Sequence, residues 1–378
     1  MKNTRIIVPV LLCLMLCSFI LGCGSNATGG GGGGGGGTTV TGTIDVCVTY
    51  DDTGTSEIIM LNAEGGYIKQ LVSLSPPSTL EALIMPPTGN IIVYEYKKNG
   101  LTDNWGYAST EGDIKRNWLS DARQVKYSAD PATLDPTKTP PNYYVVYVSS
   151  DATASNGYSL YKDGTATVKC AANPLYCQYP DLSYGGNYIA YTMYTSKYEI
   201  HAIQTYGTTT YDCSTYITGD ADYASFAPLS GTALAFMNDL GNNSRHIAAT
   251  TNITASPKAQ PWRDTHSFSE IYYPLIWSDD GNYLYFAALP VGNPTNVAIY
   301  RLDMISSSHP LVKLTNTTGG VWDGDLMKFA GINKLYFIRH NEDLVTDKVY
   351  SMNMNGSGQK ELLATVSGKR YFFKAEGY

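Results

Sequence analysis

The chain has 378 residues, a formal net charge of −7 and only 16% charged residues, against about 25% in typical soluble domains. No cluster of lysine and arginine stands out, which argues against a nucleic-acid-binding surface. Tyrosine is in excess, with 31 residues against 9 phenylalanines. Because aromatic residues favour strands, this excess predicts an all-β protein, and strand filling explains it more simply than a ligand-binding surface does.

Residues 1–22 are predicted to be a signal peptide. Lys2 and Arg5 form a short basic region, and Ile6–Leu21 is a mostly apolar run that is shorter than the roughly 20 residues of a membrane span. The run ends in Ile20-Leu21-Gly22-Cys23, which resembles the bacterial lipobox. The resemblance implies cleavage before Cys23 and lipidation of its sulfur. The alternative is an ordinary signal peptide, or an uncleaved anchor, in which this cysteine is incidental.

Residues 23–43 are predicted to be the lipidated cysteine and a flexible linker. Gly29–Gly37 is an uninterrupted run of glycine that cannot bury apolar surface and behaves as a random coil. The stretch from Gly24 to Gly42 has an r.m.s. reach of roughly 25 Å, which would let a folded domain stand off a bilayer. Because Gly24, and not an aspartate, follows the cysteine, we expect an outer-membrane destination in a host with two membranes.

Residues 44–378 show a repeat of strands without any sustained helical period. Short runs of alternating aliphatic and aromatic residues recur about every 45 to 52 residues. A period of this size, built from strands alone, is typical of β-propeller blades. The runs are Ile44–Tyr50, Ile91–Tyr96, Tyr143–Val148, Tyr188–Tyr194, Ala233–Met237, Tyr283–Ala288 and Lys334–Arg339.

The clearest unit divides into four predicted strands. Its inner strand is Ile271–Trp277, a tight turn at 278–282 leads into Tyr283–Ala288, and Val297–Asp303 and Leu311–Leu314 complete the unit. Aspartate and glycine in the turn accept the backbone angles that a hairpin requires. The next unit repeats this order with Leu335–Ile338, Lys348–Asn353 and Glu361–Leu363.

The turn and its flanking strands resemble the WD40-like repeat of TolB-type propellers. The resemblance rests on Trp277-Ser278-Asp279-Asp280-Gly281-Asn282-Tyr283, on Ile299–Asp303 and on Leu311–Thr315, with weaker copies at 179–188 and 225–231. Asp279 stands where that family usually has proline. The resemblance implies one β-propeller over residues 44–378. It does not imply membership of the Tol export system, because the α/β domain that precedes the TolB propeller has no counterpart here.

We predict seven four-stranded blades, with six or eight as alternatives because the first three units are degenerate. The first unit begins with its second strand, Ile44–Tyr50, and lacks an inner one. Arg370–Lys374 is a spare strand after the last complete unit. We expect this C-terminal strand to complete the first blade and close the ring.

Four cysteines remain after Cys23: Cys47, Cys170, Cys177 and Cys213. An exported chain meets an oxidising compartment, and four cysteines allow three pairings. Cys170 and Cys177 bracket a turn-like stretch and are the preferred pair, with Cys213 able to compete for either partner. Neither zinc-ligand spacing nor a phosphate-binding glycine loop is present, so no metal and no cofactor are expected.

Two loops on one predicted face of the ring gather the side chains that could bind a ligand. An aromatic ring, a cation, a carboxylate and imidazoles in long polar loops favour a binding site on a rigid scaffold. The alternative for the first loop is a connection between blades that only packs its tryptophan. The candidates are Trp262, Arg263, Asp264 and His266 in one loop, and His340 and Glu342 in the other.

No catalytic motif accompanies these residues. The sequence has no Gly-x-Ser-x-Gly elbow, and its paired acids are adjacent in turns, so they are poor acid/base pairs. We therefore expect a non-enzymatic, membrane-anchored propeller that presents a loop face to an envelope protein, peptide or glycan. The alternatives are a lyase- or cyclase-like enzyme with histidine, arginine and carboxylate groups at the channel mouth, and a scaffold subunit of an envelope complex.

The lipobox resemblance yields a direct test. Cys23→Ser removes the sulfur that would carry the lipid, so the variant should leave the membrane fraction or remain unprocessed. Fractionation and metabolic labelling with a radioactive fatty acid measure this outcome. Unchanged partitioning with unchanged labelling would show that Cys23 carries no lipid.

Overall fold

A computed structural model describes the greater part of the chain after residue 44. The described residues are 45–51, 55–61, 67–76, 78–84, 91–98, 101–109, 114–120, 122–127, 145–151, 157–162, 165–169, 177–204, 209–255, 261–293, 295–328, 333–341, 348–363 and 369–372. The predicted signal peptide, Cys23, the linker, Cys170 and Glu342 lie outside these residues, and so their assignments stay predictions.

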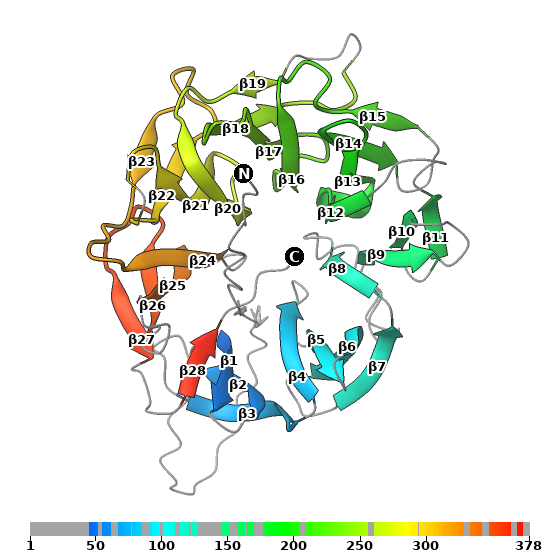
Figure 1. Cartoon of the computed structure of the whole chain (residues 1–378), viewed down its shortest axis with the longest axis vertical. Coiled ribbons are helices and arrows are strands. Elements are labelled where there is room, and N and C mark those ends of the chain that lie inside the picture. The colour runs from blue at the N-terminus through cyan, green and yellow to red at the C-terminus, as the bar shows by residue number, and fades with distance from the viewer. Residues whose placement is uncertain are drawn as a thin grey trace, which may run out of the picture.

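The described strands form a ring of antiparallel sheets (Figure 1). We name the groups of four strands blades 1 to 7 and give each from its inner to its outer strand. Blade 1 is β28 (Lys369–Phe372), β1 (Asp45–Asp51), β2 (Ser56–Leu61) and β3 (Tyr67–Leu74). Blade 2 is β4 (Ser78–Ile84), β5 (Ile91–Lys98), β6 (Leu101–Ser109) and β7 (Ile114–Ser120). Blade 3 is β8 (Ala122–Tyr127), β9 (Val145–Asp151), β10 (Gly157–Lys162) and β11 (Thr165–Lys169).

The second half of the chain continues the same order. Blade 4 is β12 (Cys177–Leu182), β13 (Tyr188–Tyr194), β14 (Tyr198–Gln204) and β15 (Thr210–Asp212). Blade 5 is β16 (Asp220–Phe226), β17 (Leu234–Asp239), β18 (Arg245–Thr250) and β19 (Trp262–Arg263). Blade 6 is β20 (Phe268–Trp277), β21 (Tyr283–Pro290), β22 (Ala298–Asp303) and β23 (Leu311–Lys313). Blade 7 is β24 (Trp322–Lys328), β25 (Lys334–His340), β26 (Lys348–Asn353) and β27 (Lys360–Leu363).

Blades 5 and 6 share one eight-stranded sheet, joined where β18 meets β20 at the single pair Arg245↔Phe268. Arg245 also binds carboxylates of both blades, Asp239 at 2.9 Å and Glu270 in a close ion pair. Within the described residues the one helical element is a 3-10 turn at Tyr184–Gly186, and no helix there is long and apolar enough to cross a membrane.

In blades 4 and 6 the turn between the first two strands is built on a serine. In blade 6 the backbone N–H of Ser278 donates to Tyr283 O, and the N–H of Tyr283 donates to Ser278 Oγ, each at 2.9 Å. Blade 4 has the same two bonds between Ser183 and Tyr188. In blade 6 the hydroxyl of Ser278 also donates to Asp280, which lowers the pKa of that carboxyl. The turn therefore forms without the proline of the related repeat.

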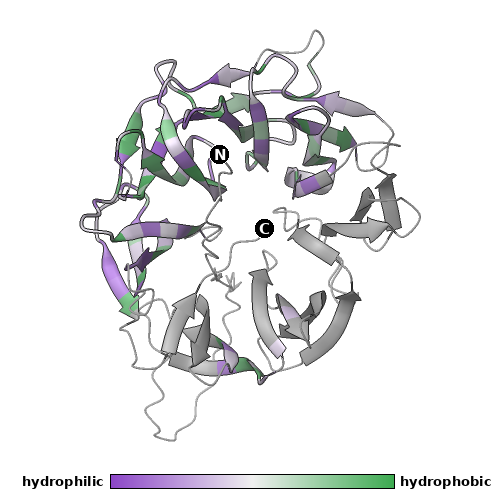
Figure 2. Cartoon of the chain, in the orientation of Figure 1, coloured by the Kyte–Doolittle hydropathy of each residue, from purple (hydrophilic) through white to green (hydrophobic). Residues whose placement is uncertain are grey.

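The hydrophobic core lies between blades. Alternate residues of a middle strand face opposite sides of its sheet, so each strand contributes to two clusters. On β17, Phe236 packs toward blade 4, whereas Ala235 and Met237 pack toward blade 6. On β21, Phe286 packs toward blade 5 and Tyr285 toward blade 7. Inner strands such as β16 and β24 are more hydrophilic than the middle strands of the same blades (Figure 2).

These observations confirm the predicted all-β propeller. The predicted strand Tyr188–Tyr194 has the observed bounds of β13, and Lys348–Asn353 has those of β26. Elsewhere the observed strands differ by a few residues: β20 begins at Phe268, three residues before the predicted start, because its first residues pair with the end of β21. β28 pairs antiparallel with β1, from Val48↔Phe372 to Asp51↔Lys369, which is the contact that the proposed closure requires.

Deleting residues 370–378 removes most of β28 and leaves β1 as an open sheet edge. We expect the free energy of unfolding to fall by about 2 kcal/mol or more, since strand pairing and apolar burial are lost together. Thermal and urea unfolding measure the change. Deletion of 374–378 alone, which keeps β28, is the matched control. Equal melting temperatures for both deletions and the full chain would show that β28 is a dispensable tail.

Candidate functional site

Each inner strand of blades 4 to 7 is interrupted by a bulge. The register with the second strand shifts between Gln178 and Asp181, Asp222 and Ser225, Tyr272 and Ile276, and Gly324 and Met327. Inside three of these bulges one residue has a positive φ: Tyr179 at 52°, Tyr223 at 54° and Asp325 at 51°. Left-handed backbone is uncommon for residues other than glycine, asparagine and aspartate, and at tyrosine it indicates a local constraint.

The bulges of blades 4, 5 and 6 place three tyrosines side by side. The ring centroids of Tyr179 and Tyr223 lie 4.1 Å apart, and those of Tyr223 and Tyr273 lie 5.2 Å apart, with 31° between the planes of each pair. All three side chains are partly exposed. They come from β12, β16 and β20, the strands nearest the centre of the ring (Figure 1). We call Tyr179, Tyr223 and Tyr273 the tyrosine arc.

Carboxylates hold the arc in place. A bulge removes backbone groups from the strand ladder, and these must find other partners. Asp222 Oδ1 accepts from the N–H of Tyr223 at 2.8 Å and from Thr192 Oγ1 of blade 4 at 2.6 Å. Asp181 Oδ2 accepts from the N–H of Phe226 at 2.7 Å, again between blades 4 and 5. Burial raises the pKa of Asp222 to about 6.

The predicted residues Trp262 and Arg263 form the short outer strand β19 rather than a loop, because they pair with Ala249 and Ala248 of β18. The Trp262 indole stacks on the His309 ring, with centroids 3.9 Å apart and planes 8° apart. Trp262 also packs against the core between blades 5 and 6. These contacts agree with the alternative interpretation of this segment, a connection between blades in which the tryptophan only packs.

Asp264 and His266 contact one another. His266 Nδ1 lies 2.8 Å from Asp264 Oδ1, and the carboxylate is buried while the imidazole is partly exposed. The backbone carbonyl of Asp264 in turn lies 3.1 Å from His246 Nδ1. The pair fixes the connection that leads from β19 into β20.

His340 has a different set of partners, in blade 7. Its Nε2 lies 3.1 Å from Asp325 Oδ2, with both groups buried, and its ring stacks on Trp322 at 3.7 Å. Trp322 stacks in turn on Tyr272 at 6.5 Å. The described candidates therefore have different partners: Trp262 stacks on His309, His266 contacts Asp264, and His340 contacts Asp325. Glu342 lies outside the described residues.

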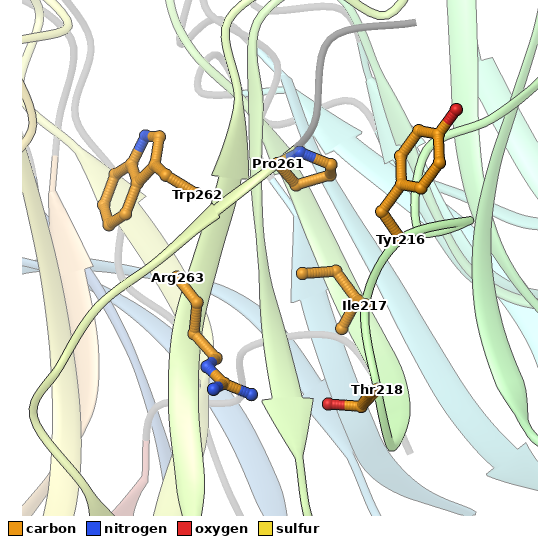
Figure 3. A pocket seen from close by; sticks show the side chains of 6 residues that line it. All are labelled: Tyr216, Ile217, Thr218, Pro261, Trp262 and Arg263. Atoms are coloured by element: carbon orange, nitrogen blue, oxygen red, sulfur yellow. The ribbon is translucent and has the colours of Figure 1, made fainter.

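A cavity of about 440 Å³ lies on the outer edge between blades 4 and 5. It is lined by Tyr216, Ile217 and Thr218, which follow β15, and by Pro261, Trp262 and Arg263 (Figure 3). This volume falls within the range of small-molecule sites, roughly 300 to 1,000 Å³.

The described cysteines do not test the predicted disulfide. Cys213 is buried, and its thiol donates to the carbonyl oxygen of Tyr211 at 3.7 Å. Cys177 begins β12, and its predicted partner Cys170 lies outside the described residues, so this pair stays a prediction. No group of three metal-ligating side chains occurs in the part of the chain that the structure describes.

Sequence reasoning missed the tyrosine arc because it attributed the tyrosine excess to strand filling. A signal was present: Tyr179-Pro180 and Tyr273-Pro274 each stand four or five residues before the serine of the turn. Tyr223 has the same spacing before Ala227. A tyrosine at nearly the same place in three successive repeats is more than a strand preference requires.

Comparisons with known proteins support the fold. No protein-family model matches the chain, and no curated protein matches it. The β-propeller domain of the trilobed protease from Pyrococcus furiosus is 8% identical, with a TM-score of 0.55 over 85% of this chain and 94% of that one. An oligogalacturonate lyase in complex with manganese is 11% identical, with a TM-score of 0.55 over 85% and 84%. TolB from Acinetobacter baumannii is 14% identical, with a TM-score of 0.47 over 84% and 78%.

These likenesses concern the fold alone, since fold does not determine function. The chain spans about half the length of a prolyl endopeptidase that it also resembles, covering 47% of that protein at a TM-score of 0.61. The chain is a β-propeller.

The pKa of Asp222 yields a prediction about stability. Folding raises this pKa from 3.8 to about 6, so the folded state holds the proton more tightly and the contribution of Asp222 to stability falls as pH rises from about 4 to 6. Asp222→Asn removes this pH-dependent loss of stability, because asparagine does not titrate. The stability of the variant relative to wild type should increase by on the order of 2 kcal/mol between pH 4 and pH 7.5. Urea unfolding across this range measures it.

Asp280→Asn is a control of opposite sign. The pKa of Asp280 is lowered by the Ser278 hydroxyl, so its contribution is present at neutral pH and is lost in acid. That variant should therefore be destabilised more at pH 6 than at pH 3. Parallel pH profiles for wild type and Asp222→Asn would contradict the assignment to Asp222.

Proposed function

We propose that this protein is an exported, lipid-anchored binding propeller of the bacterial cell envelope, which holds a protein, peptide or glycan partner at the centre of its ring. The anchor rests on the lipobox at Cys23 and the glycine linker, and an outer-membrane position rests on Gly24. The tyrosine arc is the observation that supports binding.

Stacked, partly exposed tyrosines suit this role for physical reasons. A tyrosine offers a large apolar face and a hydroxyl, and it loses little conformational entropy on binding. Three of them on neighbouring inner strands form one continuous aromatic surface. Asp222 holds the backbone of the central tyrosine, Tyr223, and Asp181 holds the nearby Phe226. The surface is thus organised in part before a partner arrives, which lowers the entropic cost of association.

An enzyme of the lyase or cyclase kind is the alternative. Such an enzyme would need arginine, histidine and carboxylate groups to meet at the mouth of the channel. His266 and His340 instead contact different carboxylates, Asp264 and Asp325. The buried His340–Asp325 pair also packs beneath an aromatic ring, as a structural pair does. The separation of these groups favours the binding function.

The test combines cross-linking with capture from detergent-solubilised envelope, using the full-length anchored protein. The double variant Tyr179→Asn, Tyr223→Asn removes two rings, while asparagine tolerates the positive φ that both positions require. We expect capture of the wild-type partner to fall about tenfold, since loss of a buried aromatic contact typically costs more than 1 kcal/mol.

Ile305→Asn is the matched control, because Ile305 is 67% exposed and lies just after β22, away from the arc. This control should capture the same partner in the same amount. A melting curve shows whether the double variant is folded at the assay temperature. A folded double variant that captures the partner as well as wild type would contradict binding at the arc.

A further inference from the structure

The cavity between blades 4 and 5 differs in character from one end to the other. Figure 3 shows the Arg263 guanidinium and the Thr218 hydroxyl turned toward each other at one end. Ile217 and Pro261 form an apolar middle, and the Tyr216 ring stands at the other end. A pair of hydrogen-bond donors beside an apolar wall suits a ligand with an anionic head and an apolar body.

The charge of Arg263 is not satisfied within the described protein. Arg263 is exposed on β19 and makes no ion pair with any described residue. The neighbouring carboxylate, Asp264, is buried and contacts His266 instead. The whole chain has a net charge of −7, yet no described carboxylate lines the cavity beside Arg263. Arg263 can therefore bind the carboxylate of a ligand.

The wall that faces Arg263 is rigid. Asn238 Nδ2 donates to the carbonyls of Thr218 and Asp220, at 2.9 and 3.0 Å. Between them, Gly219 has a φ of +86°, and a Cβ there would lie 2.2 Å from the carbonyl oxygen of Asp239. Lys197 Nζ donates to Ile217 O at 3.0 Å. Glycine is therefore required at 219, and Thr218 keeps its position when the cavity is empty.

We propose that this cavity is a second binding site, separate from the tyrosine arc, for a small ligand with a carboxylate next to an apolar or ring-shaped body. Arg263 donates a forked pair of hydrogen bonds to the carboxylate, and Thr218 donates a third. The body of the ligand lies over Ile217 and Pro261 toward Tyr216. A peptide C-terminus and an acidic sugar both have this chemistry.

Ligand-observed NMR titration of the purified full-length protein tests the proposal with two matched pairs. N-acetyl-L-leucine is compared with N-acetyl-L-leucinamide, and D-glucuronate with D-glucose. We expect at least one acid to bind and its neutral counterpart to bind at least about fivefold more weakly. Which acid binds identifies the source: the amino acid indicates a peptide terminus, and the uronate indicates an acidic glycan.

Variants locate the site. Arg263→Gln should weaken binding of the acid about fivefold or more, and Thr218→Val should weaken it by a smaller factor. The control is Lys313→Gln, which removes an exposed cation from β23, the outer strand of the next blade, and should leave the affinity within twofold. Failure of both acids to bind at 20 mM, on the order of the weakest specific affinities, would overturn the proposal. So would an equal loss in the Arg263 and Lys313 variants.

Discussion

The burial of the middle strands on both faces, as seen in blades 4 to 7, is the constraint on which the described structure depends. Side chains alternate along a strand, so consecutive residues enter the cores on opposite sides of a sheet. Phe236 and its neighbours Ala235 and Met237 show this directly. Blades 5 and 6 are therefore each stabilised by two neighbours. A substitution on one middle strand is felt at two interfaces.

The centre of the ring follows a different rule. Inner strands crowd toward one axis, and the described ones in blades 4 to 7 relieve their pairing with a bulge. The bulge of blade 5 leaves backbone N–H groups without partners in the strand ladder. Those of Tyr223 and Phe226 donate instead to Asp222 and Asp181. Positive backbone angles then turn Tyr179 and Tyr223 out of the sheet pattern. The arc is thus a product of the same geometry that builds the ring, with side chains suited to binding placed upon it.

The difference between these two regions explains what could be predicted. Strands such as β13 and β26 were predictable because each is a short run rich in aliphatic and aromatic residues, and a turn with serine or glycine lies beside it in the sequence. Bulges are not marked in this way, since an extra residue changes the register without changing the composition. The role of Trp262 was ambiguous for a similar reason: its stacking partner His309 lies 47 residues away, in another blade. The cavity also joins segments that are far apart in the sequence, so no local pattern indicated it.

The pairing of β1 with β28 has a consequence for how the protein is made. It joins Val48 to Phe372, which are separated by nearly the whole folded region. A chain synthesised from its N-terminus exposes the β1 edge until β28 has emerged. Contacts of such long range form slowly. A chain that is interrupted late in synthesis would therefore carry almost every blade and still present an unpaired strand to its neighbours.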